Sequence, residues 1–97
     1  MSVALATGRF VFLRPDDVVC HVFSDGVVVY DEADGSVQAL SPVAGEALLV
    51  CKSAGTIGVA ELAARLELDQ PSREELDSVS ALLGQFESMG FLEHTAA

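Results

Sequence analysis

The sequence predicts an α+β domain in which a small antiparallel sheet precedes three helices. In the first half of the chain, hydrophobic residues recur at about every second position, and turn residues separate the runs. In the second half the repeat is close to 3.6 residues, and residues that start and stop helices stand between the segments. The length of 97 residues, 51% of them hydrophobic, suits one domain with its own core.

The predicted sheet has three strands. The run "DVVCHVF" ends at Ser24-Asp25-Gly26, which favours a turn. The runs "VVVYD", residues 27–31, and "SVQAL", residues 36–40, flank "EADG" and are predicted to form a hairpin in which Gly35 supplies a positive φ. Both faces of the middle strand are apolar, which predicts a central strand with something packed on each side.

The N-terminal residues 1–14 are predicted to be an arm or an extra strand, and residues 15–97 the domain proper. The segment "FVFL", 10–13, has strand character and is cut off by Pro15. It forms either a further strand or an arm that orders against a neighbour. A third arrangement has "RFVFL", 9–13, covering the edge of the hairpin.

The first helix is predicted to start at Ser41-Pro42, because Ser caps free amides and Pro fits the first turn. It runs to Lys52 or Ser53 and stops before Gly55. Its surface is apolar nearly all round, so we expect it to lie between the sheet and the later helices.

Two further helices are predicted beyond it. A short one covers 59–66, and "DQPS" links it to a long one over 73–89. Ser72 and Glu75 have the spacing of a capping box, and Gly90 ends the last helix. A broad apolar stripe on that helix comprises Leu76, Val79, Leu82, Leu83, Phe86 and Met89.

The opposite face of the long helix carries small residues, which are Ser80, Ala81, Gly84 and Ser88. Small side chains let another backbone approach closely, so this face is either a contact surface or an ordinary solvent-facing one. Gly84 costs about 1 kcal/mol relative to Ala within a helix.

The charge of the chain argues against nucleic acid as a ligand. The formal net charge is −10, and the five cations are scattered over Arg9, Arg14, Lys52, Arg65 and Arg73. A nucleic-acid-binding surface needs clustered cations that displace counterions from phosphates. The acidity either steers a basic partner to the surface or simply keeps the domain soluble.

No combination of residues predicts catalysis or a metal site. The sequence lacks the common nucleophile, phosphate-loop and zinc-protease motifs. Cys20 and His21 are adjacent on a strand, so their side chains point to opposite faces and cannot share a metal. His94 lies near a terminus that we expect to fray. We therefore expect no enzyme, no metal and no cofactor.

The chain carries no predicted targeting or membrane segment. Its start, "MSVALATGRF", lacks a basic leader with a long apolar segment, and no run approaches the ~20 apolar residues that span a membrane. The expected location is the cytoplasm, with Cys20 and Cys51 as reduced, buried thiols.

The order of the predicted elements is typical of winged-helix-like domains with the strands in front. Such domains often place a helix in the DNA major groove. Here the last helix carries one cation against several carboxylates, which are Glu74, Glu75, Asp77 and Glu87. Phosphates would be repelled, so the ligand is not expected to be DNA.

In this arrangement the chain resembles the PqqD family of peptide chaperones, the RiPP recognition element type, over residues 18–93. The resemblance rests on three segments in order, "VVVYDEADGSVQALSPVAGEALLVC", "SAGTIGVAELAARL" and "EELDSVSALLGQFESMGFLE". The first is closest to the subgroup encoded beside HPr-kinase-related proteins. That subgroup often has Thr-His where this chain has Val37-Gln38.

The resemblance implies a non-catalytic protein that captures the leader of a ribosomally made precursor peptide. It would present the leader to a modifying enzyme or to an HPr-kinase-related protein. In the family the leader adds as a strand beside the last hairpin strand and packs against the third helix. Carried over, the peptide-binding residues are Val37, Gln38, Ala39, Leu40, Leu76, Val79, Ser80, Leu83 and Phe86. Some members of the family form dimers by exchanging elements, so a homodimer is one further arrangement.

Strand addition also has a physical basis in the residues themselves. A strand at the edge of a sheet presents a row of unpaired amides and carbonyls, which pair with any extended peptide. Two alternatives stay open. One is a winged-helix regulator or protein-interaction module, and the other is an acidic adaptor that docks onto a kinase-like enzyme.

Overall fold

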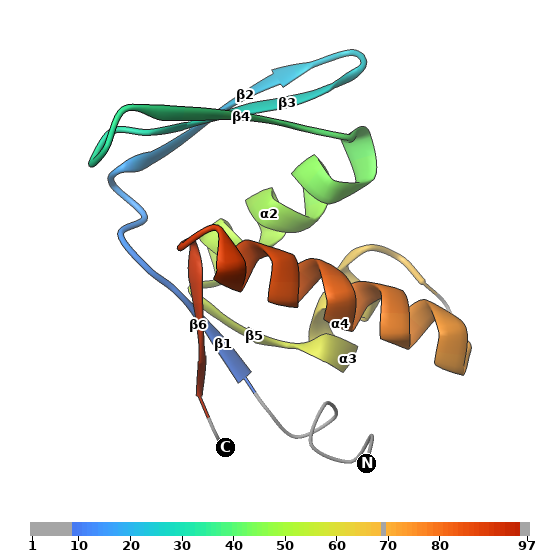
Figure 1. Cartoon of the computed structure of the whole chain (residues 1–97). Coiled ribbons are helices and arrows are strands. Elements are labelled where there is room, and N and C mark those ends of the chain that lie inside the picture. Colours follow the sequence, from blue (N-terminus) through green and yellow to red (C-terminus); the bar gives the residue numbers. More distant parts are fainter. Residues whose placement is uncertain (1–8, 69, 96–97) are drawn as a thin grey trace.

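A computed structural model describes residues 9–68 and 70–95 of the chain. Its strands are β1 (Arg9–Phe12), β2 (Val18–Phe23), β3 (Gly26–Asp31), β4 (Ser36–Leu40), β5 (Thr56–Gly58) and β6 (Leu92–Thr95). Its helices are α2 (Pro42–Ala54), α3 (Val59–Arg65) and α4 (Arg73–Ser88) (Figure 1). The predicted α+β class, with an antiparallel three-stranded sheet followed by three helices, is confirmed within this described part. Of the arm or extra strand predicted over residues 1–14, residues 1–8 lie outside it.

The first sheet has the strand order β2-β3-β4, and β3 is central as predicted. Its inner face packs on α2 and contributes the buried side chains of Val18, Val27, Val29 and Leu40. Gly45 allows the helix to approach, because a Cβ there would overlap the side chain of Val27. The predicted position of this helix, between the sheet and the later helices, is visible in Figure 1.

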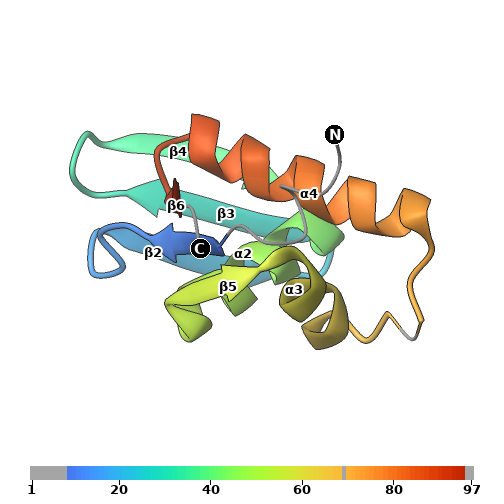
Figure 2. The same cartoon turned by 90° about the horizontal axis from the view of Figure 1, so that it is seen from below.

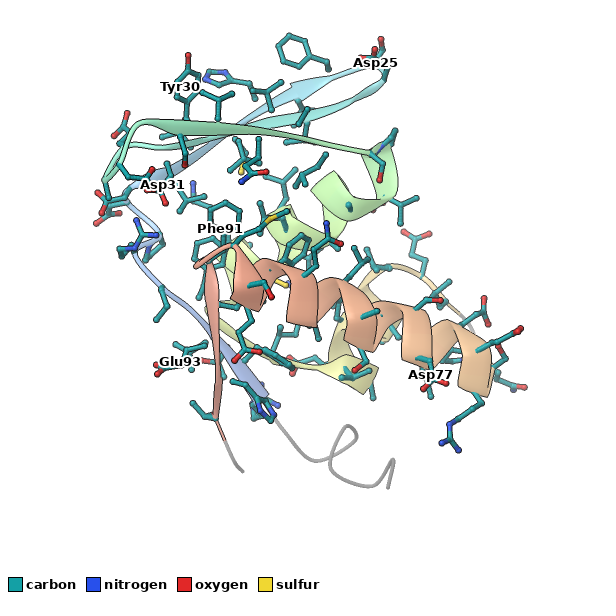
Figure 3. All side chains as sticks on the ribbon, viewed as in Figure 1. Asp25, Tyr30, Asp31, Asp77, Phe91 and Glu93 are labelled. Atoms are coloured by element: carbon teal, nitrogen blue, oxygen red, sulfur yellow. The ribbon has the colours of Figure 1, made fainter. Side chains whose placement is uncertain are left out.

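The outer face of the same sheet differs from the sequence prediction. We expected both faces to be covered, but among the described residues nothing packs on the outer one. Phe23, Tyr30 and Val37 lie on this face and are 56%, 46% and 55% exposed. Figure 3 shows Tyr30 pointing away from all the helices. The apolar residues of β3 therefore lie on two different faces, one buried in the core and one exposed to solvent.

A second sheet has the order β5-β1-β6 and joins segments from distant parts of the chain. The expected strand near residues 10–13 forms as β1, and Phe10 and Phe12 are buried in the same core as the helices. Because β1 pairs with β5 and β6, the arrangement in which "RFVFL" covers the edge of the hairpin is wrong.

The strands β5 and β6 were not predicted. The expectation that the chain frays at His94 is also wrong. His94 lies in β6 opposite Phe10 of β1, and the centroids of their two rings are 4.7 Å apart. Both strands are too short to show a periodicity of their own.

The long helix α4 begins where the sequence predicts and ends at Ser88, one residue before the predicted end. Ser72 Oγ accepts a hydrogen bond from the Glu75 amide at 3.1 Å, and Glu75 Oε1 accepts one from the Ser72 amide at 2.9 Å. This reciprocal pair is the predicted capping box. After Gly90 the chain turns back and buries Phe91. No helix within the described residues has the length and hydrophobicity that crossing a membrane requires.

A partly buried ion pair connects the two sheets. Arg14 donates to both carboxylate oxygens of Asp31, at 2.7 and 2.8 Å, and Asp31 is only 4% exposed. The same guanidinium donates to the Gly90 carbonyl at 3.3 Å. Asp31 also accepts from the Ala33 amide at 3.0 Å, which fixes the turn after β3. The pair thus holds the β1–β2 connection, the hairpin and the end of α4 together.

This ion pair predicts a loss of stability in acid. The hydrogen bond from Arg14 lowers the pKa of the Asp31 carboxyl below its ordinary 3.8, while burial acts in the opposite direction. Because the folded-state pKa is the lower one, the stabilisation is present above about pH 4 and is lost as the pH falls through the folded-state pKa. Asp31→Asn should therefore lower the urea midpoint strongly at pH 7 and much less at pH 3. An equal loss at both pH values would contradict this assignment.

Candidate functional site

The backbone of β4 has one free edge. Within residues 9–68 and 70–95, β4 pairs with β3 and with no other strand. The Glu32 amide donates to the Asp17 carbonyl at 2.8 Å, which continues the ladder between β2 and β3. Hydrogen-bonded pairs alternate along an antiparallel ladder, so the even-numbered residues of β3 bond to β2 and the odd-numbered ones to β4.

The register between β3 and β4 then shows which groups are free. The odd-numbered residues of β3 are opposite Ser36, Gln38 and Leu40. The amides and carbonyls of Val37 and Ala39 consequently point away from β3, along the open edge. These two residues present the donors and acceptors that an added strand would use.

The side chains of β4 alternate in the same way. Val37 and Ala39 are exposed on the outer face, while Leu40 is 8% exposed and belongs to the core. Gln38 is half-buried on the inner face. Of the four predicted strand residues, Val37 and Ala39 offer both backbone and side chain, whereas Leu40 is occupied by packing.

The open edge lies on the same side of the molecule as α4. Figure 2 shows β4 as the strand of its sheet on the α4 side, whereas β2 lies on the side of β5 and α3. The two elements that the sequence analysis assigned to one peptide site therefore border the same region.

The predicted residues on α4 do not form one exposed surface. Val79, Leu83 and Phe86 are 3%, 0% and 0% exposed and pack in the core. Leu83 and Phe86 therefore offer no free surface to a ligand in this state, whereas Val79 also borders a cleft beside the helix. Leu76 and Ser80 are half-buried. Val79, Leu83 and Phe86 form the centre of the apolar stripe, and this centre faces the core.

The flank of α4 that borders a cleft carries Val79, which was predicted as a site residue, and Leu82, which was not. Leu82 lines the cleft, and Ser80 lies across the helix from it, since two residues turn the helix by about 200°. Glu87, seven residues after Ser80 and on its flank, accepts from the His94 amide at 3.4 Å, so this flank faces β6. Leu82 belongs to the apolar stripe predicted from the sequence but was not among the predicted site residues.

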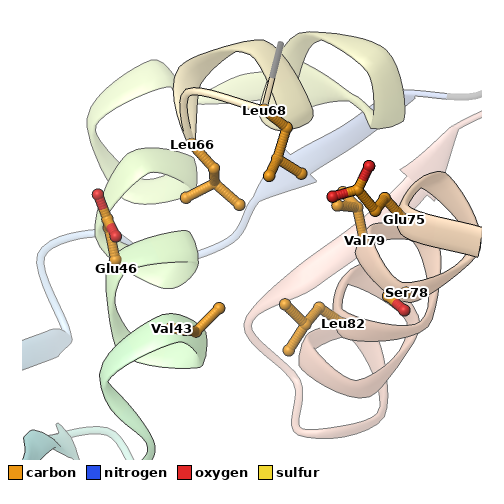
Figure 4. A pocket seen from close by; sticks show the side chains of 8 residues that line it. All are labelled: Val43, Glu46, Leu66, Leu68, Glu75, Ser78, Val79 and Leu82. Carbon is orange, nitrogen blue, oxygen red and sulfur yellow. The ribbon is translucent and has the colours of Figure 1, made fainter. Parts of the chain in front are cut away.

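The cleft itself has a volume of about 310 Å³ and lies between α2, the residues after α3, and α4. Its lining is Val43, Glu46, Leu66, Leu68, Glu75, Ser78, Val79 and Leu82 (Figure 4). Val43 is 64% exposed and follows the end of β4 by three residues, so the cleft opens near the end of the free edge.

The two thiols are poorly suited to nucleophilic chemistry. Burial raises the pKa of Cys51 to about 12, and burial also raises the pKa of Cys20 against the opposing effect of Lys52. A thiol reacts as its thiolate, so both groups are largely unreactive near neutral pH. Across the described part of the chain, no three His, Cys, Asp or Glu residues are grouped so that they could hold a metal ion.

Comparison with known proteins shows the fold. No family model matches the chain, and no curated protein matches it either. Among solved structures, the chain is similar to TbiB1, which was solved in complex with the TbiA(beta) leader peptide. The two share 19% sequence identity with a TM-score of 0.63, over 80% of this chain and 91% of TbiB1.

Proposed function

We propose that this protein is a non-catalytic peptide chaperone of the PqqD and RiPP recognition element kind. It captures the leader of a ribosomally made precursor peptide as an added strand on β4 and presents it to a modifying enzyme. The observation that carries the proposal is the free edge of β4, where the backbone groups of Val37 and Ala39 point outward. The fold shared with TbiB1, a protein that binds a leader peptide, supports it.

The chemistry of the edge accounts for both affinity and selectivity. Backbone hydrogen bonds from an extended peptide satisfy the outward groups of Val37 and Ala39 whatever the peptide sequence. Selectivity then depends on the peptide's side chains, half of which face α4 and the cleft. The buried residues Leu83 and Phe86 act in this proposal by holding α4 in place rather than by contacting the ligand.

The partner enzyme, the location and the oligomeric state follow from the resemblance. The segment over residues 27–51 favours an HPr-kinase-related protein as the partner. Free cysteines fit action in the reducing cytoplasm. A homodimer formed by exchanged elements is the further arrangement that the family offers, and duplex nucleic acid is not among the proposed ligands.

A titration with the leader peptide encoded beside the gene tests the proposal. Isotope-labelled protein should show amide shifts within residues 36–40 as the peptide is added. Saturation with no shifts in that strand would rule out strand addition at β4.

A second candidate is an adaptor or winged-helix regulator that binds a protein partner. The exposed apolar face formed by Phe23, Tyr30 and Val37 favours it, because isolated domains rarely leave such a surface open. Purification with a partner enzyme in the absence of any peptide would support the adaptor. Duplex binding that weakens steeply with salt would instead support the regulator.

A further inference from the structure

The cleft beside the open edge combines apolar walls with two carboxylates. Leu66, Leu68 and Leu82 supply much of the wall, and Glu46 and Glu75 stand on it as well. Figure 4 shows Glu46 on the α2 side and Glu75 on the α4 side of the opening. The cleft therefore presents negative charge from both sides around an apolar interior.

Both carboxylates have capacity for a ligand. Glu75 uses Oε1 to accept from the Ser72 amide, and its Oε2 has no partner among residues 9–68 and 70–95. Glu46 is exposed and forms no ion pair with any residue in those ranges. None of the chain's five cations lines the cleft, so a cation from outside would complete it.

A lysine or arginine side chain matches this chemistry. Its methylene stem packs on apolar surface while its charged end stays at a polar rim, an arrangement that suits long basic side chains. In the cleft, the leucine walls would contact the apolar stem and the two carboxylates would contact the charged end. A purely apolar side chain would leave both carboxylates without a partner, and an acidic one would be repelled.

The direction of β4 indicates where along the peptide sequence this lysine or arginine would stand. The strand runs towards Leu40, and Val43 of the cleft follows three residues later. Every strand pair in the described sheets is antiparallel, and antiparallel addition continues this pattern. A peptide added in this way starts near Leu40, so the residues before its pairing stretch extend towards the cleft.

We infer that the cleft between α2 and α4 binds a lysine or arginine side chain located N-terminal to the stretch of peptide that pairs with β4. The inference rests on the proposed function, because it assigns the class of peptide that the same site selects. The net charge of −10 acts in the same direction by attracting basic peptides.

The first test uses a small probe and needs no peptide. n-Hexylamine, added to labelled protein at low salt, should shift amides around Val43, Leu68 and Leu82, and hexanoate should not. The double variant Glu46→Gln/Glu75→Gln should lower the affinity for the amine about threefold to tenfold, as expected for two exposed charges. Gln at position 75 keeps the capping box, so the helix start is preserved. Equal shifts with n-hexanol, or no shifts at the cleft, would overturn the inference.

The second test uses the leader peptide together with a matched control. Glu74→Gln/Glu93→Gln changes the net charge equally, at two exposed carboxylates that do not line the cleft. The cleft variant should bind the leader several-fold more weakly than this control. If the two variants bound the leader with equal affinity and the amides of residues 36–40 still shifted, the cleft assignment would be refuted. Strand addition at β4 would still be supported. Absence of leader binding would refute the proposed function, while the hexylamine result still decides the cleft.

Discussion

Replacing Ala39 by proline should weaken leader binding about tenfold or more and leave the domain folded. The amide of residue 39 points away from β3, so its loss removes a donor from the free edge and not from the sheet. One hydrogen bond is worth about 0.5–1.5 kcal/mol, and the proline ring adds a clash with the incoming backbone. Prolines are tolerated on edge strands, which is why folding should survive. Titration calorimetry with the leader measures the effect.

Two control variants separate this effect from damage to the sheet. Ala39→Ser keeps the amide and should bind like the wild type. Gln38→Pro removes a donor that faces β3 and should destabilise the hairpin itself. If Ala39→Pro bound the leader with unchanged affinity, the edge would not be the binding surface.

Replacing Gly45 by alanine should destabilise the protein by about 1–3 kcal/mol, as overpacked core substitutions do. A Cβ at this position would overlap the Cβ and Cγ2 atoms of Val27 on the central strand. The helix α2 would have to move away from β3, or Val27 would have to leave its place in the core. Urea denaturation followed by circular dichroism measures the change in the free energy of unfolding.

Gly84→Ala is the matched control, since it makes the same substitution inside α4. An added Cβ there meets nothing within 4 Å. This substitution should stabilise the protein by up to about 1 kcal/mol through helix propensity. Changes of the same sign at both positions would contradict the packing described for α2. Weaker partner binding by Gly84→Ala would indicate that the small-residue face of α4 is a contact surface.

Local signals in the sequence predicted much of the fold. The hairpin of β3 and β4, the start of α2 at Ser41-Pro42 and the capping box at Ser72 each depend on residues within a few positions of one another. The second sheet depends on distant pairing instead, as in the hydrogen bond between Arg9 and Thr95, which are 86 positions apart. Strands of three or four residues carry too little periodicity to predict such pairings.

The free edge of β4 was predictable from the sequence, whereas the division of α4 into buried and cleft-lining residues was not. The edge position of β4 follows from its place at the end of a hairpin, and the structure places Val37 and Ala39 outward. On α4 the apolar stripe is broad, and its periodicity does not show which residues face the core. The structure buries Leu83 and Phe86 and puts Leu82 beside the cleft.

The ion pair between Arg14 and Asp31 shows the same limitation. Arg14 and Asp31 are 17 positions apart, and neither belongs to a motif. The sequence predicted that a strand ends at Asp31 and that a turn follows, and the structure confirms both. That its carboxylate would be buried against a guanidinium from the β1–β2 connection depends on how the two sheets meet.

Amide hydrogen exchange tests the central claim most directly. In the free protein, the amides of Val37 and Ala39 should exchange faster than the amide of Gln38, which faces β3. Saturating leader peptide should slow exchange at Val37 and Ala39 and leave Gln38 nearly unchanged. Unaltered exchange at Val37 and Ala39, with the peptide shown to be bound, would mean that it binds elsewhere.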